Sequence, residues 1–395
     1  MAGRPPKASY PPLHRLSPLA RFVILYAALY AAFGAISPFL PAYFKDCGLT
    51  AQDIALVIGL GTAVRLVSGP LAGQLADRRR TWRGTLSVCA AGAGAISLAY
   101  LIAYGFGGIL LAGLAQSALL APVAPLADAL ALSASLPSGS KGFEYGIVRG
   151  AGSAAFVAGS IVAGHIAASH GLASAIRLNA FLLAAAALVA LTAPPILAGS
   201  RVLRPGGFDD ILRLTRLRGF RRLLLLAALV LGSHAVHDTF AVIRWRDAGV
   251  TTATASLLWS ESVIAEVVVF FLVGPALLRW LGPAGAAMLA AGAGVVRWSV
   301  LGATVEIIPL MLVEPLHGLT FAVFHLAGMR VIGATVPRHL AATAQALYAT
   351  AAVGAATALL TLASGFLYTW LEGDAFFVMA LLCAAALPLA AGMTR

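Results

Sequence analysis

Hydrophobic stretches of roughly 20 residues recur along the whole chain, and each is long enough to cross a bilayer core about 30 Å thick. Lipid offers no partner for backbone hydrogen-bonding groups, so a chain can span it only as helices or as a closed β-barrel. A barrel would need short segments of alternating polarity, whereas these runs are long and continuous. The sequence therefore predicts an all-α polytopic membrane protein.

Composition excludes several other classes of protein. Only 11% of the residues are charged and 60% are hydrophobic, whereas a soluble domain has about 25% charged residues. The three cysteines lie far apart without a CxxC or disulfide pattern, which indicates packing roles. No Gly-rich phosphate loop, nucleophile–base constellation or nucleic-acid patch stands out. We therefore expect neither an enzyme nor a cofactor-binding or nucleic-acid-binding protein.

The chain divides into two predicted halves of six spans each. We expect a cytosolic N-terminal tail at 1–18, an N-terminal half at 19–197, a basic cytosolic linker at 198–219 and a C-terminal half at 220–395. The linker contains a basic amphipathic piece that could lie on the membrane surface. The twelve spans are predicted at 19–44, 52–76, 82–104, 107–133, 143–168, 172–195, 220–245, 251–279, 283–304, 307–333, 339–369 and 374–393.

Lysine and arginine are distributed unevenly over the predicted loops. With both termini in the cytosol, 19 of the 27 basic residues lie on the cytosolic side, four lie on the opposite side and four lie inside spans. Helical membrane proteins carry an excess of Lys and Arg in their cytosolic loops. The formal charge of +12 is therefore mostly a topology signal, with anionic lipid as its counterpart.

The loop after the second predicted span reads GQLADRRRTWR. Gly73, Asp77 and Arg78 have the spacing Gly-xxx-Asp-Arg, which resembles the signature loop of the major facilitator superfamily. In that loop the acid pairs with helix ends and basic residues and locks one conformation. The glycine expected two residues after the first basic position is Arg80 here. The resemblance implies a conformational gate at Gly73, Asp77 and Arg78. It also implies two six-helix halves, each built from inverted three-helix repeats, around a mid-membrane site.

Five further blocks resemble one family within that superfamily. They read PVAPLADALA, FEYGIVRGAGSAAFVAGS, LLWSESVIAEVVVF, GVVRWSVLGAT and LHGLTFAVFHLAGMRVI. They are similar to the phenylpropionate permease family, which are 3-phenylpropionate/proton symporters of bacterial inner membranes, and more distantly to the lactose permease family. The resemblance runs from the first span to about residue 370. It implies a multi-pass transporter of the bacterial inner membrane that uses the proton gradient as its energy source.

The lactose permease pattern implies roles for four residues that precede the last two blocks. Its substrate-contacting acid on the fourth helix and arginine on the fifth correspond to Asp128 and Arg149. Asp238 lies where that pattern has a seventh-helix acid, whereas the phenylpropionate pattern tends to an aromatic residue. Glu266 matches the AEV block of the phenylpropionate pattern and lies within two residues of the eighth-helix acid of the lactose pattern.

The last two blocks carry the pattern's arginine and histidine. The ninth-helix arginine corresponds to Arg297 and the tenth-helix histidine to His317. The proton-carrying glutamate of the pattern, one turn beyond that histidine, is replaced by Thr320. Glu314, one turn before the histidine, could take its role. We expect Arg297 to hold this acid in place, with contact to the solute as a second role.

Ionisable residues inside the spans support these assignments independently. A charged side chain at mid-bilayer costs at least about 2.5–3.5 kcal/mol on insertion scales, so it normally faces a cavity or a partner. Glu314 and His317 are three residues apart on one helix and share a face, and His234, His237 and Asp238 cluster likewise. We predict a substrate-binding set and a proton-coupling set. The first is Arg65, Asp128, Arg149, Asp238, Trp259 and Arg297, and the second is His237, Glu266, Arg297, Glu314 and His317.

The predicted function is proton-coupled symport of a small organic solute by alternating access. The solute is an aromatic or other carboxylate, as the phenylpropionate resemblance implies, and guanidinium groups bind carboxylates in bidentate geometry. If the cavity acids are ionised, a neutral sugar or nucleoside is the alternative solute. Transport of a metal complex, with His234, His237 and Asp238 as ligands, is a further alternative, as is a drug-efflux pump. We expect a monomer.

Overall fold

The computed structural model of this protein describes residues 16–135, 143–194 and 208–392, which are helical almost throughout. Most of the predicted tail at 1–18 and the first half of the predicted linker at 198–219 lie outside the described residues. The α-helices are α1 (Pro18–Ile36), α2 (Leu40–Asp46), α3 (Ala51–Arg79), α4 (Trp82–Tyr100), α5 (Gly105–Leu120), α6 (Val123–Ser135), α7 (Tyr145–His170), α8 (Ala173–Ala190), α9 (Phe208–Arg216), α10 (Arg218–Val230), α11 (Ala235–Asp247), α12 (Thr252–Val268), α13 (Gly274–Ala303), α14 (Ile307–Val313), α15 (Phe324–Thr335), α16 (Ala341–Leu347), α17 (Ala356–Leu371) and α18 (Ala375–Ala391).

Short segments of tighter or wider helix join several of these elements. The 3₁₀ segments are η2 (Gly232–His234), η4 (Glu314–Leu316), η6 (Arg338–Leu340) and η8 (Glu372–Asp374). The π-helical segments are η3 (Val269–Val273), η5 (Gly318–Val323) and η7 (Tyr348–Ala355). Such segments change the direction of side chains within a helix and are frequent at functional sites.

Prolines explain several of the interruptions in the predicted spans. Proline lacks an N–H group and its ring clashes with the preceding turn, so a helix ends or kinks there. The first span therefore divides into α1 and α2 around Pro38, and the fourth divides into α5 and α6 at Pro122. Inside α13, Gly282 has the non-helical φ of 66° and is followed by Pro283. The predicted spans 251–279 and 283–304 meet at this kink.

Nine helical stretches among the described residues are long and apolar enough to cross a membrane. Two of them, Thr252–Ala303 and Arg338–Ala391, contain 52 and 54 residues. A straight helix of 52 residues would measure about 78 Å, far more than a bilayer core, and each stretch covers two predicted spans. The third predicted span corresponds to α4, which is not among the nine. The count of twelve spans therefore remains a prediction.

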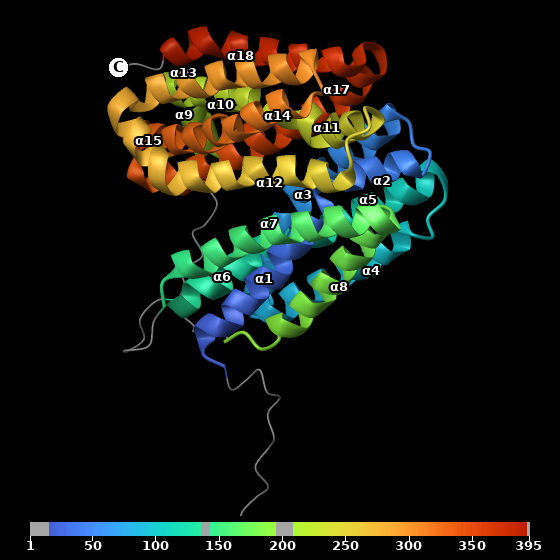
Figure 1. The fold of residues 1–395 in the computed structure, drawn as a ribbon. Helices are drawn as coiled ribbons and strands as arrows, with labels where there is room; N and C mark the ends of the chain where they lie inside the picture. The colour runs from blue at the N-terminus through green and yellow to red at the C-terminus, as the bar shows by residue number, and fades with distance from the viewer. Residues whose placement is uncertain (1–15, 136–142, 195–207, 393–395) are drawn as a thin grey trace, which may run out of the picture.

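The helices α1 to α8 gather in one group and α9 to α18 in another (Figure 1). We name these groups the N-terminal helices and the C-terminal helices. Each group has buried apolar side chains of its own, around Phe22 and Leu29 in the first and around Phe220 and Phe324 in the second. Within the first group α1 and α7 pack so closely that a Cβ added at Gly159 would collide with the carbonyl oxygen of Ala31.

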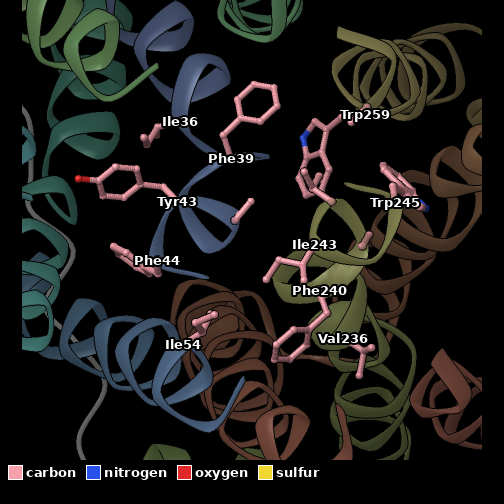
Figure 2. Close-up of a cluster of buried hydrophobic side chains, with 14 of the residues drawn as sticks. Ile36, Phe39, Tyr43, Phe44, Ile54, Val236, Phe240, Ile243, Trp245 and Trp259 are labelled. Carbon is pink, nitrogen blue, oxygen red and sulfur yellow. The ribbon is translucent and has the colours of Figure 1, made fainter. Parts of the chain in front are cut away.

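A third apolar cluster, the joint core, contains residues of both groups. In Figure 2 Phe39, Tyr43 and Phe44 come from the N-terminal helices, and Phe240 and Trp259 come from the C-terminal helices. Around the joint core α2 packs against α11, and α7 packs against α12. The two groups are therefore held together by buried apolar contacts close to α2 and α11.

Candidate functional site

Arg297 and Glu314 form a fully buried ion pair. Nη2 of Arg297 on α13 lies 2.6 Å from Oε2 of Glu314 at the start of η4, and both side chains are 0% exposed. The guanidinium group also lies over the ring of Trp298, 4.6 Å from its centroid. Two charges removed from water are tolerated only with close pairing and further hydrogen bonds. This pair has both.

His237 connects the buried pair to a second carboxylate. Its Nε2 lies 3.2 Å from Oε1 of Glu314, and its Nδ1 lies 3.1 Å from Oδ1 of Asp238, its neighbour on α11. The His237 ring stacks on Trp259 of α12, with 5.1 Å between centroids and 18° between planes. Stacking and two hydrogen bonds together fix the orientation of the imidazole.

His317 connects the same pair to a third carboxylate. Its Nδ1 lies 3.1 Å from Nη1 of Arg297, and its Nε2 lies 3.3 Å from Oε2 of Glu266 on α12. The close approach of α12 depends on Gly318, because an added Cβ there would lie 2.7 Å from the carbonyl oxygen of Ala265. The five predicted proton-coupling residues thus lie in one connected cluster, which we name the charge network.

A cavity of about 360 Å³ lies beside the charge network. Pockets for small molecules in proteins have volumes of about 300–1,000 Å³, so this one suits a small solute. Arg297 and Glu314 do not line it, because His237 and His317 stand between them and the cavity. The cavity is lined by Ser37, Phe156, Leu231, His234, His237, Asp238, Trp259, Ser262, Val263, Glu266, His317, Phe321, Val353 and Thr357.

Asp128 and Arg149, the predicted substrate-contacting acid and arginine, each bind tyrosine side chains. The Asp128 carboxylate accepts hydrogen bonds from Tyr26 and, at 2.8 Å, from Tyr145. Arg149 donates a hydrogen bond to the Tyr30 hydroxyl and lies over that ring. Neither residue lines the 360 Å³ cavity, so their contact with substrate remains a prediction.

Arg65 lies away from the charge network. It lines a separate cavity of about 120 Å³ among the N-terminal helices, together with Tyr100, Gln116 and Ser117. Tyr100 donates to Gln116 Oε1 at 3.0 Å. Arg65 therefore lies at a different place from the charge network. Its role in substrate binding remains a prediction.

The predicted gate residues, Gly73, Asp77 and Arg78, lie in the last turns of α3. Within the described residues Asp77 has no ion pair, so the predicted locking contact is not seen here. The next residue after α3, Arg80, has φ 53° and ψ 36°, which is the left-handed conformation. Glycine adopts that conformation without strain. This explains why the superfamily pattern has glycine at this position.

Two ion pairs that the sequence did not lead us to expect join the two groups of helices. Lys45 Nζ lies 2.5 Å from Oδ2 of Asp247. Arg246 binds both carboxylate oxygens of Asp46, at 3.0 and 3.1 Å. These reciprocal bridges link the end of α2 to the end of α11. A signal was present, because KDCGLT at 45–50 and RDAGVT at 246–251 repeat one pattern.

The metal alternative finds no support in the geometry of the described residues. Among them no group of three His, Cys, Asp or Glu side chains is placed to hold a metal ion. His234 turns away from Asp238: its Nδ1 faces the carbonyl oxygens of Val230 and Leu231, and its Nε2 faces the Thr320 hydroxyl at 3.0 Å.

Comparison with known proteins finds membrane transporters that are similar to this chain. A model of the MFS_1-like family matches residues 19–379. The "Probable 3-phenylpropionic acid transporter" of Escherichia coli (strain K12) is 32% identical over 365 residues, which cover 90% of this chain and 93% of that protein. The maltose permease of Geobacillus stearothermophilus is 24% identical, over 92% of this chain and 91% of that protein. Among solved structures, the nucleoside transporter NupG has a TM-score of 0.80 at 18% identity, over 96% of this chain and 98% of that one.

Proposed function

Because this chain belongs to the MFS_1-like family of the major facilitator superfamily, we propose that it is a proton-coupled symporter of a small aromatic carboxylate. In this proposal the chain is a monomeric transporter of the bacterial inner membrane with twelve spans in two six-helix halves. Both termini lie in the cytosol, as the distribution of basic residues favours. The site alternates between the two sides of the membrane.

The observation that carries the proposal is the buried pair of Arg297 and Glu314 beside a cavity. Removing the charge of one partner leaves the other buried and unpaired, which costs about 3–5 kcal/mol in known buried pairs. A proton that neutralises Glu314 must therefore be accompanied by a new partner for Arg297 or by a rearrangement of the helices. This cost links proton binding at Glu314 to a rearrangement of the helices or to a new partner for Arg297. Coupling of proton and solute transport requires such a link.

Aromatic side chains on the cavity favour an aromatic solute. Phe156, Trp259 and Phe321 line it from both groups of helices. Aromatic pairs contribute about 0.5–1.5 kcal/mol beyond the burial of their area. The name of the Escherichia coli relative, a 3-phenylpropionic acid transporter, points to the same class of solute. In the protonated form, His317 would supply positive charge for a carboxylate.

A neutral sugar or nucleoside is the second candidate solute, and one observation favours it. The described lining of the 360 Å³ cavity contains two carboxylates, Asp238 and Glu266, and neither Lys nor Arg. Hydrogen-bonding groups without a free guanidinium suit a neutral polyhydroxylated solute as well as an anion.

Uptake into proteoliposomes with an alkaline interior tests the proposal. We expect labelled 3-phenylpropionate to accumulate only while the pH gradient lasts. A weak acid also enters alkaline liposomes unaided, so protein-free liposomes and liposomes with Glu314→Gln give the background. The same assay includes other aromatic acids, sugars, nucleosides and metal complexes. Accumulation no greater than this background for every organic solute would refute the proposal.

A further inference from the structure

We propose that His237 carries protons between the cavity and Glu314, with Asp238 as the group that exchanges them with the cavity. This inference rests on the proposed proton coupling and specifies its route. It concerns Asp238 and two members of the charge network, His237 and Glu314, and each lies within hydrogen-bond distance of the next.

Exposure defines the two ends of the route. The Asp238 side chain is 53% exposed and lines the cavity, whereas the Glu314 side chain is 0% exposed and does not. His237 is 3% exposed and lies between them. A proton from the cavity can therefore reach Glu314 only through another group, and His237 contacts both carboxylates.

The partners of the other two histidines exclude them as carriers to Glu314. Nδ1 of His317 faces a guanidinium nitrogen of Arg297, which donates hydrogen bonds and cannot accept a proton. Nδ1 of His234 donates to backbone carbonyl oxygens, and its Nε2 contacts the Thr320 hydroxyl rather than a carboxylate. Of these three histidines, only His237 has a carboxylate oxygen at each of its ring nitrogens.

The transfer balances without any further reactant. At the start Asp238 is protonated and donates to Nδ1 of His237, while the Nε2–H group donates to the Glu314 carboxylate. The Asp238 proton then moves to Nδ1 as the Nε2 proton moves to Oε1 of Glu314. One O–H and one N–H bond break, one of each forms, and the neutral imidazole exchanges its tautomer. After the cavity has opened to the other side, the reverse transfer returns the proton to Asp238 and restores the first tautomer.

Arg297 stabilises the state in which Glu314 is protonated, through a contact with Nε2 of His237. Its Nη2 lies 3.3 Å from Nε2 of His237. Once Nε2 has lost its hydrogen, the guanidinium can donate to it and so replaces part of its contact with neutralised Glu314. The other ionisable groups near His237 come from η2, α12, α13 and the segments after α14, whereas α17 and α18 contain no Asp, Glu, Lys, Arg or His. These groups are His234, Glu261, Glu266, Arg297, Glu314 and His317.

Two transport assays distinguish a defect in proton transfer from a defect in cargo binding. Equilibrium exchange of labelled for unlabelled 3-phenylpropionate needs no net proton movement, whereas accumulation against a pH gradient does. We expect Asp238→Asn and His237→Gln to reduce gradient-driven accumulation about 100-fold more than they reduce exchange, which is the scale of a positioned proton-transfer group. Because both residues line the cavity, a loss of cargo binding lowers both modes and cancels in their ratio. Glu261→Gln is the matched control, because it removes a nearby carboxylate outside the route and is expected to keep both modes.

The outcomes distinguish this inference from the proposed function. If the wild-type protein accumulates solute and Asp238→Asn does so equally, only the route is wrong. If a folded Asp238→Asn protein loses exchange and accumulation to the same extent, Asp238 acts in cargo binding alone and the route is wrong. If the wild-type protein shows no gradient-driven accumulation, the proposed function fails.

A second measurement needs no cargo. After a rapid pH drop, infrared difference spectra follow the protonated-carboxyl band that Glu314→Gln removes. We expect this band to form about 100-fold more slowly in His237→Gln than in the wild type or in Glu261→Gln. An unchanged rate in His237→Gln would overturn the route.

Discussion

At the residue scale, the ion pair of Arg297 with Glu314 makes stability depend on keeping both partners. Because each charge is fully buried, we expect Glu314→Gln or Arg297→Gln alone to destabilise the protein by about 3–5 kcal/mol. The double variant Arg297→Met/Glu314→Leu removes both charges and leaves none unpaired. It should therefore lose less than the sum of the two single variants.

Thermal unfolding of the purified protein in detergent measures these differences. Asp77→Asn is the control, since Asp77 has no ion pair within the described residues. Losses that simply add up in the double variant would mean that the two charges do not depend on each other.

The sequence predicted which ionisable residues lie inside the spans, but it did not predict all of their partners. Glu314, Arg297 and His317 were expected together because their spacing and the family pattern agree. Asp128 and Arg149 are predicted to contact substrate, and in the structure each binds a tyrosine of α1. Tyrosine on an apolar helix gives no sequence signal of its partner, because its ring also suits simple packing.

At the element scale, the end of α3 contains avoidable strain. Arg80 has a left-handed conformation, which costs a residue with a Cβ about 1–2 kcal/mol. We expect Arg80→Gly to raise the stability of the protein by about 1 kcal/mol, the gain reduced by the extra freedom of glycine in the unfolded chain. Differential scanning fluorimetry measures the change.

Arg79→Gly is the matched variant for this prediction. It removes the same charge from a neighbouring position that is still helical, where glycine costs up to about 1 kcal/mol relative to a good helix former. Equal effects of the two variants would show that charge, rather than backbone conformation, decides stability at this loop.

The packing of α1 on α7 gives a second prediction for an element. We expect Gly159→Ala to force the two helices apart, because its Cβ would collide with the backbone of Ala31. Gly150→Ala on the same helix is the control, since nothing lies within 4 Å of the added Cβ. It should be neutral or stabilising, because alanine is a better helix former. A lower Tm in Gly150→Ala than in Gly159→Ala would contradict the close packing.

Element boundaries were predictable where proline sets them and less so elsewhere. Pro38 and Pro122 divide predicted spans as their chemistry requires. The π-helical segment η5 has no such marker, and its wider turn depends on how α12 and α13 pack around it. Local sequence does not contain that tertiary information.

At the scale of the whole molecule, the joint core and the reciprocal bridges close one end of the contact between the two groups of helices. The four charged side chains of the bridges are partly exposed, and exposed pairs contribute about 0.2–1 kcal/mol. We expect Asp247→Lys to shift the population about fivefold toward the state open at this end. Lys45→Asp in the same chain restores a bridge of reversed polarity and should restore the closed state.

Labelling measures this shift. Ser262 lines the cavity, so a Ser262→Cys variant without the three native cysteines reports access from outside the cell to a membrane-impermeant maleimide. We expect faster labelling in Asp247→Lys, wild-type labelling in the double variant, and a smaller difference at high salt. Faster labelling in the double variant than in the single one would refute the role of the bridge.

The class of fold was predictable from long apolar runs, since lipid leaves so few alternatives. The position of one group of helices against the other was not, because it rests on contacts between residues far apart in the sequence, such as Lys45 and Asp247, which are 202 positions apart. The repeated pattern KDCGLT and RDAGVT was visible in the sequence. Only the structure shows that the two copies face each other.

The reciprocal bridges also show a self-complementary contact. A basic residue followed by an acidic one is self-complementary, because two copies of the dipeptide facing each other across a two-fold axis make two equal bridges. Lys45 and Asp46 meet Arg246 and Asp247 in this manner. The same two-residue pattern, used once in each group of helices, is therefore enough to supply both halves of the closing contact.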